Sequence, residues 1–128
     1  MIRGVPAAEI PSLLDSLKPF IEKFASISRG RFTVKTLFQD IMERDRQVWV
    51  AGDFQAVCMT SIGLSSVNID FCAGVRAREW QSDLEQEIRT WAISLGKKRI
   101  FVTGRRGWER FGKPLGYREI ERNYMLEL

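Results

Sequence analysis

The carboxylate best placed for acid–base chemistry is that of Asp70. With Asn68, it lies on one face of an expected strand, Val67–Phe71, in which apolar and polar residues alternate. A carboxylate in this position could remove a proton from a substrate, directly or through water. The alternative is a structural role, in which a neighbouring strand, a helix end or an arginine satisfies the carboxylate. Asp70 is therefore the candidate catalytic base.

A short basic loop follows this strand and leads into a long amphipathic helix. The backbone N–H groups at the start of such a helix, together with arginine side chains, could bind the phosphates of a cofactor. The residues expected to contact this ligand are Cys72, Ala73, Gly74, Val75, Arg76 and Arg78. The alternative is that the two arginines only cover Trp80 with their aliphatic stems.

A second pair of arginines, Arg105 and Arg106, follows the next expected strand and could face the same cofactor. The surrounding segment, 96–122, contains nine basic and three acidic residues, a net charge of +6 against +4 for the whole chain. Such an excess favours a polyanionic partner: a phosphorylated cofactor, nucleic acid or an acidic protein face. A solvated arginine-rich surface is the alternative. For nucleic acid the only support is charge.

The histidine and cysteine content of the chain argues against several other kinds of catalytic and metal site. The chain has no histidine, which excludes Ser-His and Cys-His relays and argues against a zinc site, so no metal is expected. Its two cysteines, Cys58 and Cys72, lie in apolar strand patterns and are expected to be small buried hydrophobes in a reducing compartment.

The length of 128 residues predicts one domain, 1–128, and a hydrophobic content of 45% is enough for a core. No apolar run reaches the 18 residues of a membrane span, and the N-terminal residues do not resemble a signal peptide. We therefore expect a cytoplasmic protein that does not contact a membrane.

Periodicity predicts a mixed α/β (α+β) fold in the order strand, helix, helix, three strands, helix, strand, helix, strand. The first helix is expected to kink or restart at Pro19, and Thr33 to cap the second. Gly52 and Asp53 suit the turn of an antiparallel hairpin. The expected strands are 1–5, 47–51, 54–62, 67–71, 99–103 and 119–128, and the long and short later helices are 80–95 and 108–111. A helix between strands 67–71 and 99–103 predicts a parallel pair.

This order resembles the GNAT superfamily of N-acetyltransferases over nearly the whole chain. The specific part is the long helix ending in Trp91-Ala-Ile-Ser-Leu-Gly96, followed by a strand and then by Arg110-Phe-Gly-Lys-Pro-Leu-Gly-Tyr117. The segment Gly104-Arg-Arg-Gly-Trp-Glu-Arg110 resembles small GNAT-like proteins of tailed bacteriophages and prophages, some of which are virion components.

The resemblance implies a central sheet of about six strands with helices on both faces. It also implies that two parallel strands separate just beyond Ala73, and that acetyl-CoA lies between them. The acceptor would be an amine or a protein, and phage structural proteins are the expected partners of a virion component. The location would then be the host cytoplasm or the virion.

The sequence departs from the family pattern in two places. The phosphate-binding loop is usually glycine-rich, whereas Val75-Arg-Ala-Arg-Glu-Trp-Gln81 contains no glycine. The usual general-acid tyrosine would fall near Phe111 or Gly112, and neither can donate a proton; Tyr117 is expected to serve packing. The two functions that remain are an acyl-CoA-dependent N-acyltransferase with a degenerate cofactor loop and a non-catalytic module for virion assembly or protein binding. Taken alone, these departures slightly favour the second and predict weak or absent acetyl-CoA binding.

Overall fold

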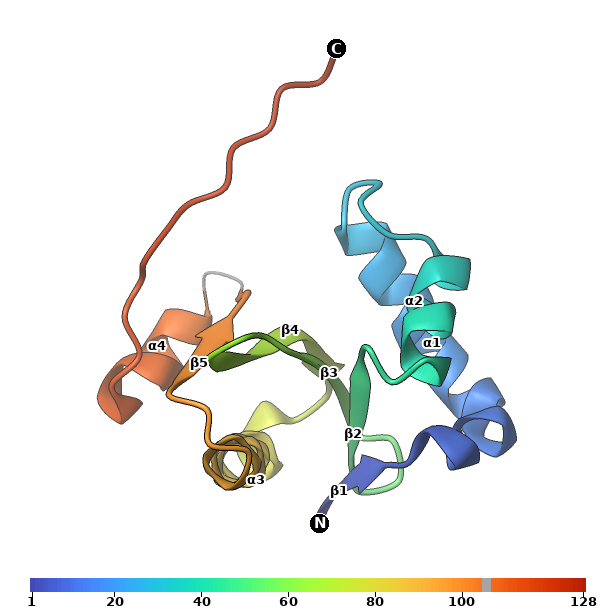
Figure 1. Cartoon of the computed structure of the whole chain (residues 1–128), viewed down its shortest axis with the longest axis horizontal. Helices are drawn as coiled ribbons and strands as arrows, with labels where there is room; N and C mark the ends of the chain where they lie inside the picture. The colour runs from blue at the N-terminus through green and yellow to red at the C-terminus, as the bar shows by residue number, and fades with distance from the viewer. Residues whose placement is uncertain (105–106) are drawn as a thin grey trace.

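The computed structural model describes residues 1–104 and 107–128, and five strands within them form one mixed sheet (Figure 1). The strands are β1 (Ile2–Val5), β2 (Gln47–Ala51), β3 (Ala56–Ile62), β4 (Ser66–Gly74) and β5 (Arg99–Val102). The first four are antiparallel neighbours in chain order, and β5 pairs with β4 in parallel. The expected parallel pair is therefore confirmed.

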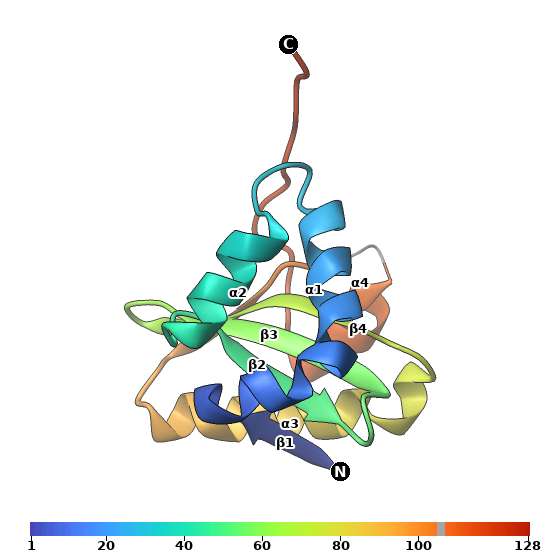
Figure 2. The ribbon, with the colours of Figure 1, turned by 90° about the vertical axis from the view of Figure 1, so that its right-hand side faces the viewer.

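Helices cover both faces of this sheet. The α-helices are α1 (Leu14–Ile27), α2 (Val34–Met42), α3 (Gln81–Ser94) and α4 (Trp108–Gly112), and the 3-10 helices are η1 (Ala7–Leu13), η2 (Ala77–Glu79) and η3 (Lys113–Leu115). Figure 2 shows α1 and α2 in front of the sheet with α3 behind it. Thr33 caps α2 as expected, since its hydroxyl accepts from the N–H of Thr36 at 3.1 Å.

Each face of the sheet has its own hydrophobic cluster. Under α1 and α2, the buried side chains include Leu17, Ile21, Phe24, Leu37, Ile41, Val57, Met59 and Phe71. Under α3, they include Trp49, Cys58, Val67, Ile69, Trp80, Leu84, Ile88 and Ala92. The apolar stripe expected on the long helix is thus the face that α3 buries, and the mixed α/β class with helices on both faces is confirmed.

Two expected features are wrong. The first is the final strand: residues 119–128 form no strand, so the sheet has five strands, close to the expected count of about six. Loose alternation of apolar residues is insufficient because a strand also needs a neighbour to pair with its backbone.

The second is the break in the first helix, which lies at Leu13/Leu14, where η1 meets α1, and not at Pro19. Pro19 removes only one backbone hydrogen bond near the start of α1, and Ile21 and Phe24 beyond it remain buried in the same core. Continued burial of one apolar face is what keeps α1 intact across the proline.

Among the described residues, none of the helices combines the length and the apolar character that a membrane crossing requires.

Candidate functional site

The candidate site begins where β4 and β5 separate. Their pairing runs from Ser66 opposite Arg99 to Ile69 opposite Val102, and a last hydrogen bond joins the N–H of Thr103 to the carbonyl of Ile69 at 3.0 Å. β4 continues to Gly74 without a partner on that side in the described part of the chain. The separation therefore starts after Ile69, four residues before the expected position beyond Ala73, because β5 ends as soon as it reaches Val102.

A β-bulge in β4 places Asp70 at the point of separation. Met59 of β3 lies opposite Phe71, and the next residue, Thr60, lies opposite Ile69, so Asp70 has no residue opposite it. As a result, Ile69 packs under α3 whereas Phe71 packs under α1 and α2. The bulge reverses the face of the sheet toward which the side chains after Asp70 point. An alternating sequence pattern cannot reveal such a reversal.

The Asp70 carboxylate has two hydrogen-bonding partners. The hydroxyl of Ser61 donates to Oδ2 at 2.7 Å, and Nη1 of Arg46 donates to the same oxygen at 2.9 Å. Asn68 Nδ2 donates to the hydroxyl of Ser61 at 3.2 Å, which confirms that Asn68 and Asp70 lie on the same face. The side chain of Asp70 is still 23% exposed, so a solvent-borne group can reach it.

Arg46 is the functional candidate that the sequence interpretation missed. Its side chain is only 10% exposed, and its guanidinium carbon lies 5.2 Å from the ring centre of Phe24 and 5.0 Å from that of Phe32. A second, longer ion pair joins it to Asp40 at 3.5 Å. Arg46 follows α2 by only four residues, but nothing in its sequence neighbourhood indicates that it reaches across to Asp70.

Burial and charge act on Asp70 in opposite directions. Burial raises the pKa of the Asp70 carboxyl above its usual value, while the Ser61 hydrogen bond and the Arg46 charge lower that pKa in part. Burial is the largest of the three effects. A carboxylate held in this way binds a proton more readily than one in water, which suits a general base.

The loop after β4 is held by a contact to its own backbone and by Gln55 of the neighbouring β2–β3 turn. Arg76 adopts a left-handed conformation, with φ 54°, at the position where glycine would be expected. The indole N–H of Trp80 donates to the carbonyl of Val75 at 2.7 Å, and Gln55 Nε2 donates to the Glu79 carboxylate at 3.0 Å. The loop therefore has a defined shape without a glycine.

Charge at the start of α3 is mixed. No side chain of the described residues caps this helix, so its first backbone N–H groups have no side-chain acceptor there and could bind an anion. The exposed Arg78 adds a positive charge nearby. Asp83 lies in the first turn and Glu79 pairs with Arg76 at 3.3 Å, and both acids oppose a phosphate. The helix start thus offers N–H donors with a weaker positive charge than the sequence suggested.

Some of the remaining candidate residues pack against neighbouring elements, and some line a hollow on the surface. Ala73 is buried under α1, and Gly74 packs so closely on β3 that an added Cβ would lie 2.4 Å from the Cβ of Ala56. Ala73, Gly74 and Val75 also line a hollow of about 270 Å³ with Pro19, Phe20, Lys23, Phe54 and Gln55. Arg105 and Arg106 lie outside the described residues.

The two cysteines lie opposite each other on β3 and β4. Cys58 is fully buried as expected, and its hydrogen bond with Cys72 and its burial raise the pKa of the Cys58 thiol well above the usual value. The expectation that Cys72 is also buried is wrong: it is exposed, because no strand of the described residues lies beside β4 on that side at that point. Its position beside the unpaired stretch of β4 makes it a natural reporter of ligand binding there.

Tyr117 lies on the α3 side of the molecule and not at Asp70. Its ring packs edge-on against Trp108, with ring centres 5.4 Å apart. Burial, with a smaller contribution from the Glu85 carboxylate, raises the pKa of Tyr117 to about 12, and Arg89 lowers it in part. A half-buried phenol beside α3 fits the packing role expected of Tyr117.

Solved structures with the same architecture cover the entire chain. A probable acetyltransferase has a TM-score of 0.74 at 16% identity, and the match covers 100% of this chain and 97% of the other. The chain has the GNAT fold.

Two further structures with this fold carry more specific names. Aminoglycoside N-acetyltransferase AAC(6')-Iy in complex with CoA has a TM-score of 0.68 at 14% identity, covering 100% of this chain and 98% of that one. A ribosomal-protein-alanine N-acetyltransferase from Brucella melitensis biovar Abortus 2308 has a TM-score of 0.68 at 12% identity, covering 100% and 99%. No protein-family model matches the sequence, and no curated protein matches it significantly. At such identities the likeness shows the GNAT fold alone.

Proposed function

We propose that this protein is an acyl-CoA-dependent N-acyltransferase of the GNAT fold, with a degenerate cofactor loop and with Asp70 as its general base. The observation that carries the proposal is the separation of β4 from β5 after Ile69, with Asp70 the first residue of β4 beyond the paired stretch. The presence of CoA in the complex of AAC(6')-Iy, which has the same fold, supports the choice of cofactor.

The residues at the gap suit acetyl-CoA in three respects. The edge of β4 from residue 70 to Gly74 pairs with no other described strand, so its backbone groups could bind an extended pantetheine arm as they would bind a further strand. The uncapped start of α3 offers N–H groups to the pyrophosphate. Arg76 and Arg78 lie beside that helix end. When bound, acetyl-CoA would supply the activated acyl group.

The protein's own contribution is to orient the acceptor and to take a proton. The Asp70 carboxylate accepts the proton of the acceptor amine, directly or through water, and Ser61 and Arg46 hold the carboxylate in position. Because Arg46 is itself packed against two phenylalanine rings, the carboxylate has little freedom to rotate.

Cofactor binding is tested separately from catalysis. Acetyl-CoA at one hundred times its dissociation constant should stabilise the protein by about 2.7 kcal/mol. It should also slow the reaction of the exposed Cys72 with a thiol reagent, while Cys58 stays unreactive because it is buried. If saturating acetyl-CoA changes neither the melting temperature nor the rate of Cys72 modification, the cofactor site is absent.

Catalysis is tested with Asp70→Asn, which keeps the size of the side chain and its acceptance of hydrogen bonds through the amide oxygen. We expect this variant to lose turnover by about 100-fold or more while binding acetyl-CoA as the wild type does. The matched control is Asp53→Asn, an exposed carboxylate in the β2–β3 turn, which should leave the rate unchanged. An undiminished rate in Asp70→Asn would remove Asp70 from the mechanism.

A second candidate function is a non-catalytic GNAT-fold module that binds protein, as part of a phage particle. The observation that favours it is the cofactor loop, in which Arg76 takes a strained left-handed conformation and Asp83 and Glu79 lie where phosphate would bind. This function predicts no protection of Cys72 by acetyl-CoA and no turnover with any amine, so the same two assays distinguish the candidates.

A further inference from the structure

The two cysteines of the chain form a cross-strand pair. β3 and β4 are neighbouring antiparallel strands (Figure 2), and their register places Cys58 directly opposite Cys72. The register is regular from Ala56 to Met59, and the bulge comes only after this stretch. Residues directly opposite each other in such a pair of strands share one face of the sheet. Both cysteine side chains therefore lie on the face where Cys58 packs under α3.

The cysteines occupy the closer of the two kinds of position in an antiparallel pair. The N–H of Val75 donates to the carbonyl of Gln55 at 3.0 Å, so these two residues form a hydrogen-bonded pair. Hydrogen-bonded and non-hydrogen-bonded pairs alternate along antiparallel strands, and the cysteines are three positions further along. They are thus a non-hydrogen-bonded pair, in which the Cα atoms lie about 4.5 Å apart.

This spacing permits a disulfide bond between Cys58 and Cys72. The Cα atoms of disulfide-bonded cysteines lie roughly 4.4–6.8 Å apart, so the bond needs no change in the pairing of the strands. The spacing is at the short end of that range, and a disulfide away from its preferred geometry is more easily reduced. The geometry therefore suits a bond that forms and breaks, as redox-sensing disulfides do.

The two thiols differ in their access to solvent. Cys58 is fully buried under α3, whereas Cys72 is exposed. The Cys72 side chain has the largest of the effects that raise the pKa of the Cys58 thiol, so the two groups are close enough to interact. A dissolved reagent therefore meets Cys72 first, and Cys58 is reached through Cys72.

We propose that Cys58 and Cys72 are a site of reversible oxidation, at which a small disulfide such as glutathione disulfide converts the two thiols into an intramolecular disulfide bond. The Cys72 thiol loses its proton, and the thiolate attacks one sulfur of the small disulfide. An S–S bond forms between Cys72 and that sulfur. The other half of the reagent leaves as a thiolate and takes up a proton.

Cys58 completes the reaction. Its thiol loses its proton and its sulfur attacks the Cys72 sulfur, which forms the Cys58–Cys72 bond and releases the second half of the reagent as a thiolate that takes up this proton. Two protein thiols are thus oxidised to one disulfide, and one disulfide of the reagent is reduced to two thiols. The site is independent of the acyltransferase proposal, since it requires neither acetyl-CoA nor an acceptor amine.

The first experiment incubates the folded full chain with glutathione disulfide and measures its mass without reduction. The wild type should lose the mass of two hydrogen atoms and retain no glutathione at equilibrium, and excess dithiothreitol should restore both thiols. Cys58→Ala should stop at the mixed disulfide, with one glutathione on Cys72, because the second thiol is missing. The matched variant Cys72→Ser should not react, because Cys58 is buried.

Four results of this experiment would overturn the proposal. They are a wild type that stays reduced, a wild type that retains glutathione at equilibrium, two chains linked through Cys72, and a Cys72→Ser variant that reacts as fast as the wild type. The wild type and Cys72→Ser decide the matter by themselves, since the substitution at the exposed position leaves the buried core intact.

The second experiment compares the folded chain with the chain unfolded in urea, in buffers of fixed ratios of glutathione to glutathione disulfide. The ratio at which half of the chains are oxidised gives the effective concentration of one thiol at the other. We expect the folded value to be higher by roughly tenfold or more, because the sheet already holds the cysteines opposite each other, whereas the unfolded chain must close a loop of about 15 residues. A folded value no higher than the value in urea would mean that the strands oppose the bond, and the proposal would fail.

Discussion

Replacing Arg46 with methionine tests the arrangement that holds Asp70. Methionine keeps an unbranched apolar stem against Phe24 and Phe32 but removes the guanidinium group that pairs with Asp70 at 2.9 Å. The Asp70 carboxylate is then left partly buried with only the Ser61 hydrogen bond. A half-buried unpaired carboxylate is more costly than an exposed one, so the variant should be less stable than the wild type.

The size of the loss follows from how buried the pair is. Removing one partner of a fully buried ion pair costs about 3–5 kcal/mol, and an exposed pair contributes about 0–1 kcal/mol. Because Arg46 is 10% exposed and Asp70 is 23% exposed, we expect a loss of about 2–3 kcal/mol at neutral pH, which includes the lost cation–π contacts. For a domain of this size, that corresponds to a fall in melting temperature of about 10 °C.

The pH dependence separates the charge effect from simple packing. Burial already raises the pKa of Asp70, and removing Arg46 raises that pKa further because one of the two lowering effects is lost. A raised pKa means that the folded state holds the proton more tightly than the unfolded chain. The resulting stability is therefore present below the unfolded pKa of about 3.9 and is lost as pH rises through the folded value. In Arg46→Met this loss extends to higher pH, so the difference from the wild type should shrink at acid pH.

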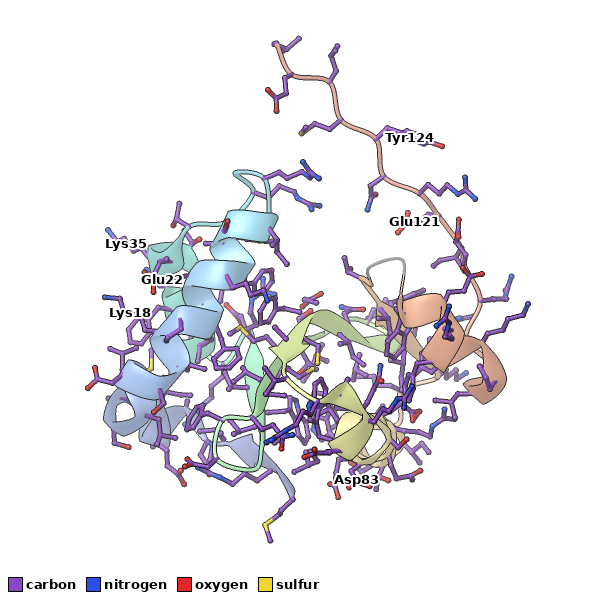
Figure 3. All side chains as sticks on the ribbon, turned by 180° about the vertical axis from the view of Figure 1, so that it is seen from behind. Lys18, Glu22, Lys35, Asp83, Glu121 and Tyr124 are labelled. Carbon is purple, nitrogen blue, oxygen red and sulfur yellow. The ribbon has the colours of Figure 1, made fainter. Side chains whose placement is uncertain are left out.

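Urea denaturation of both proteins over a pH series measures these quantities directly. Lys35→Met serves as the control because it removes an exposed cation of α2, labelled in Figure 3, and should change stability by less than about 0.5 kcal/mol. A loss below about 1 kcal/mol in Arg46→Met would place the pair among exposed surface pairs and refute the reasoning. An equal loss at pH 4 and pH 7 would attribute the effect to packing and not to the Asp70 charge.

Two further predictions concern the packing around the site. Gly74→Ala should destabilise the fold by about 2–3 kcal/mol, since the new Cβ would lie 2.5 Å from the carbonyl oxygen of Gln55. Gly107→Ala should be nearly neutral in the same thermal denaturation, since no atom of the described residues would lie within 4 Å of its Cβ. Tyr117 should ionise at about 12, so an absorbance titration of the wild type should show a step there that Tyr117→Phe lacks. Because this pKa is raised, the stability it contributes is present below pH 10 and lost towards pH 12; a Tyr117 step near pH 10 would contradict its burial.

Sequence patterns predicted most of the fold because each correctly predicted helix or strand depends on residues that are close together in the chain. The apolar stripe of α3, the Thr33 cap of α2 and the hairpin between β2 and β3 depend on residues a few positions apart. The basic loop and the parallel crossover followed from the order of these elements. For the same reason Asp70 could be recognised as a candidate, since its strand and its neighbours in the chain are visible in the sequence.

The features of the site that only the tertiary structure decided depend on contacts between residues that are far apart in the chain. Arg46 meets Asp70 across 24 positions, and the bulge that frees Asp70 arises from the register between β3 and β4, which no single strand specifies. β4 and β5 separate after Ile69, earlier than the sequence indicated, because β5 is short. The last segment has the composition of a strand, but its backbone has no neighbour within the described chain. A strand exists only with a partner, and the choice of partner is a property of the folded assembly.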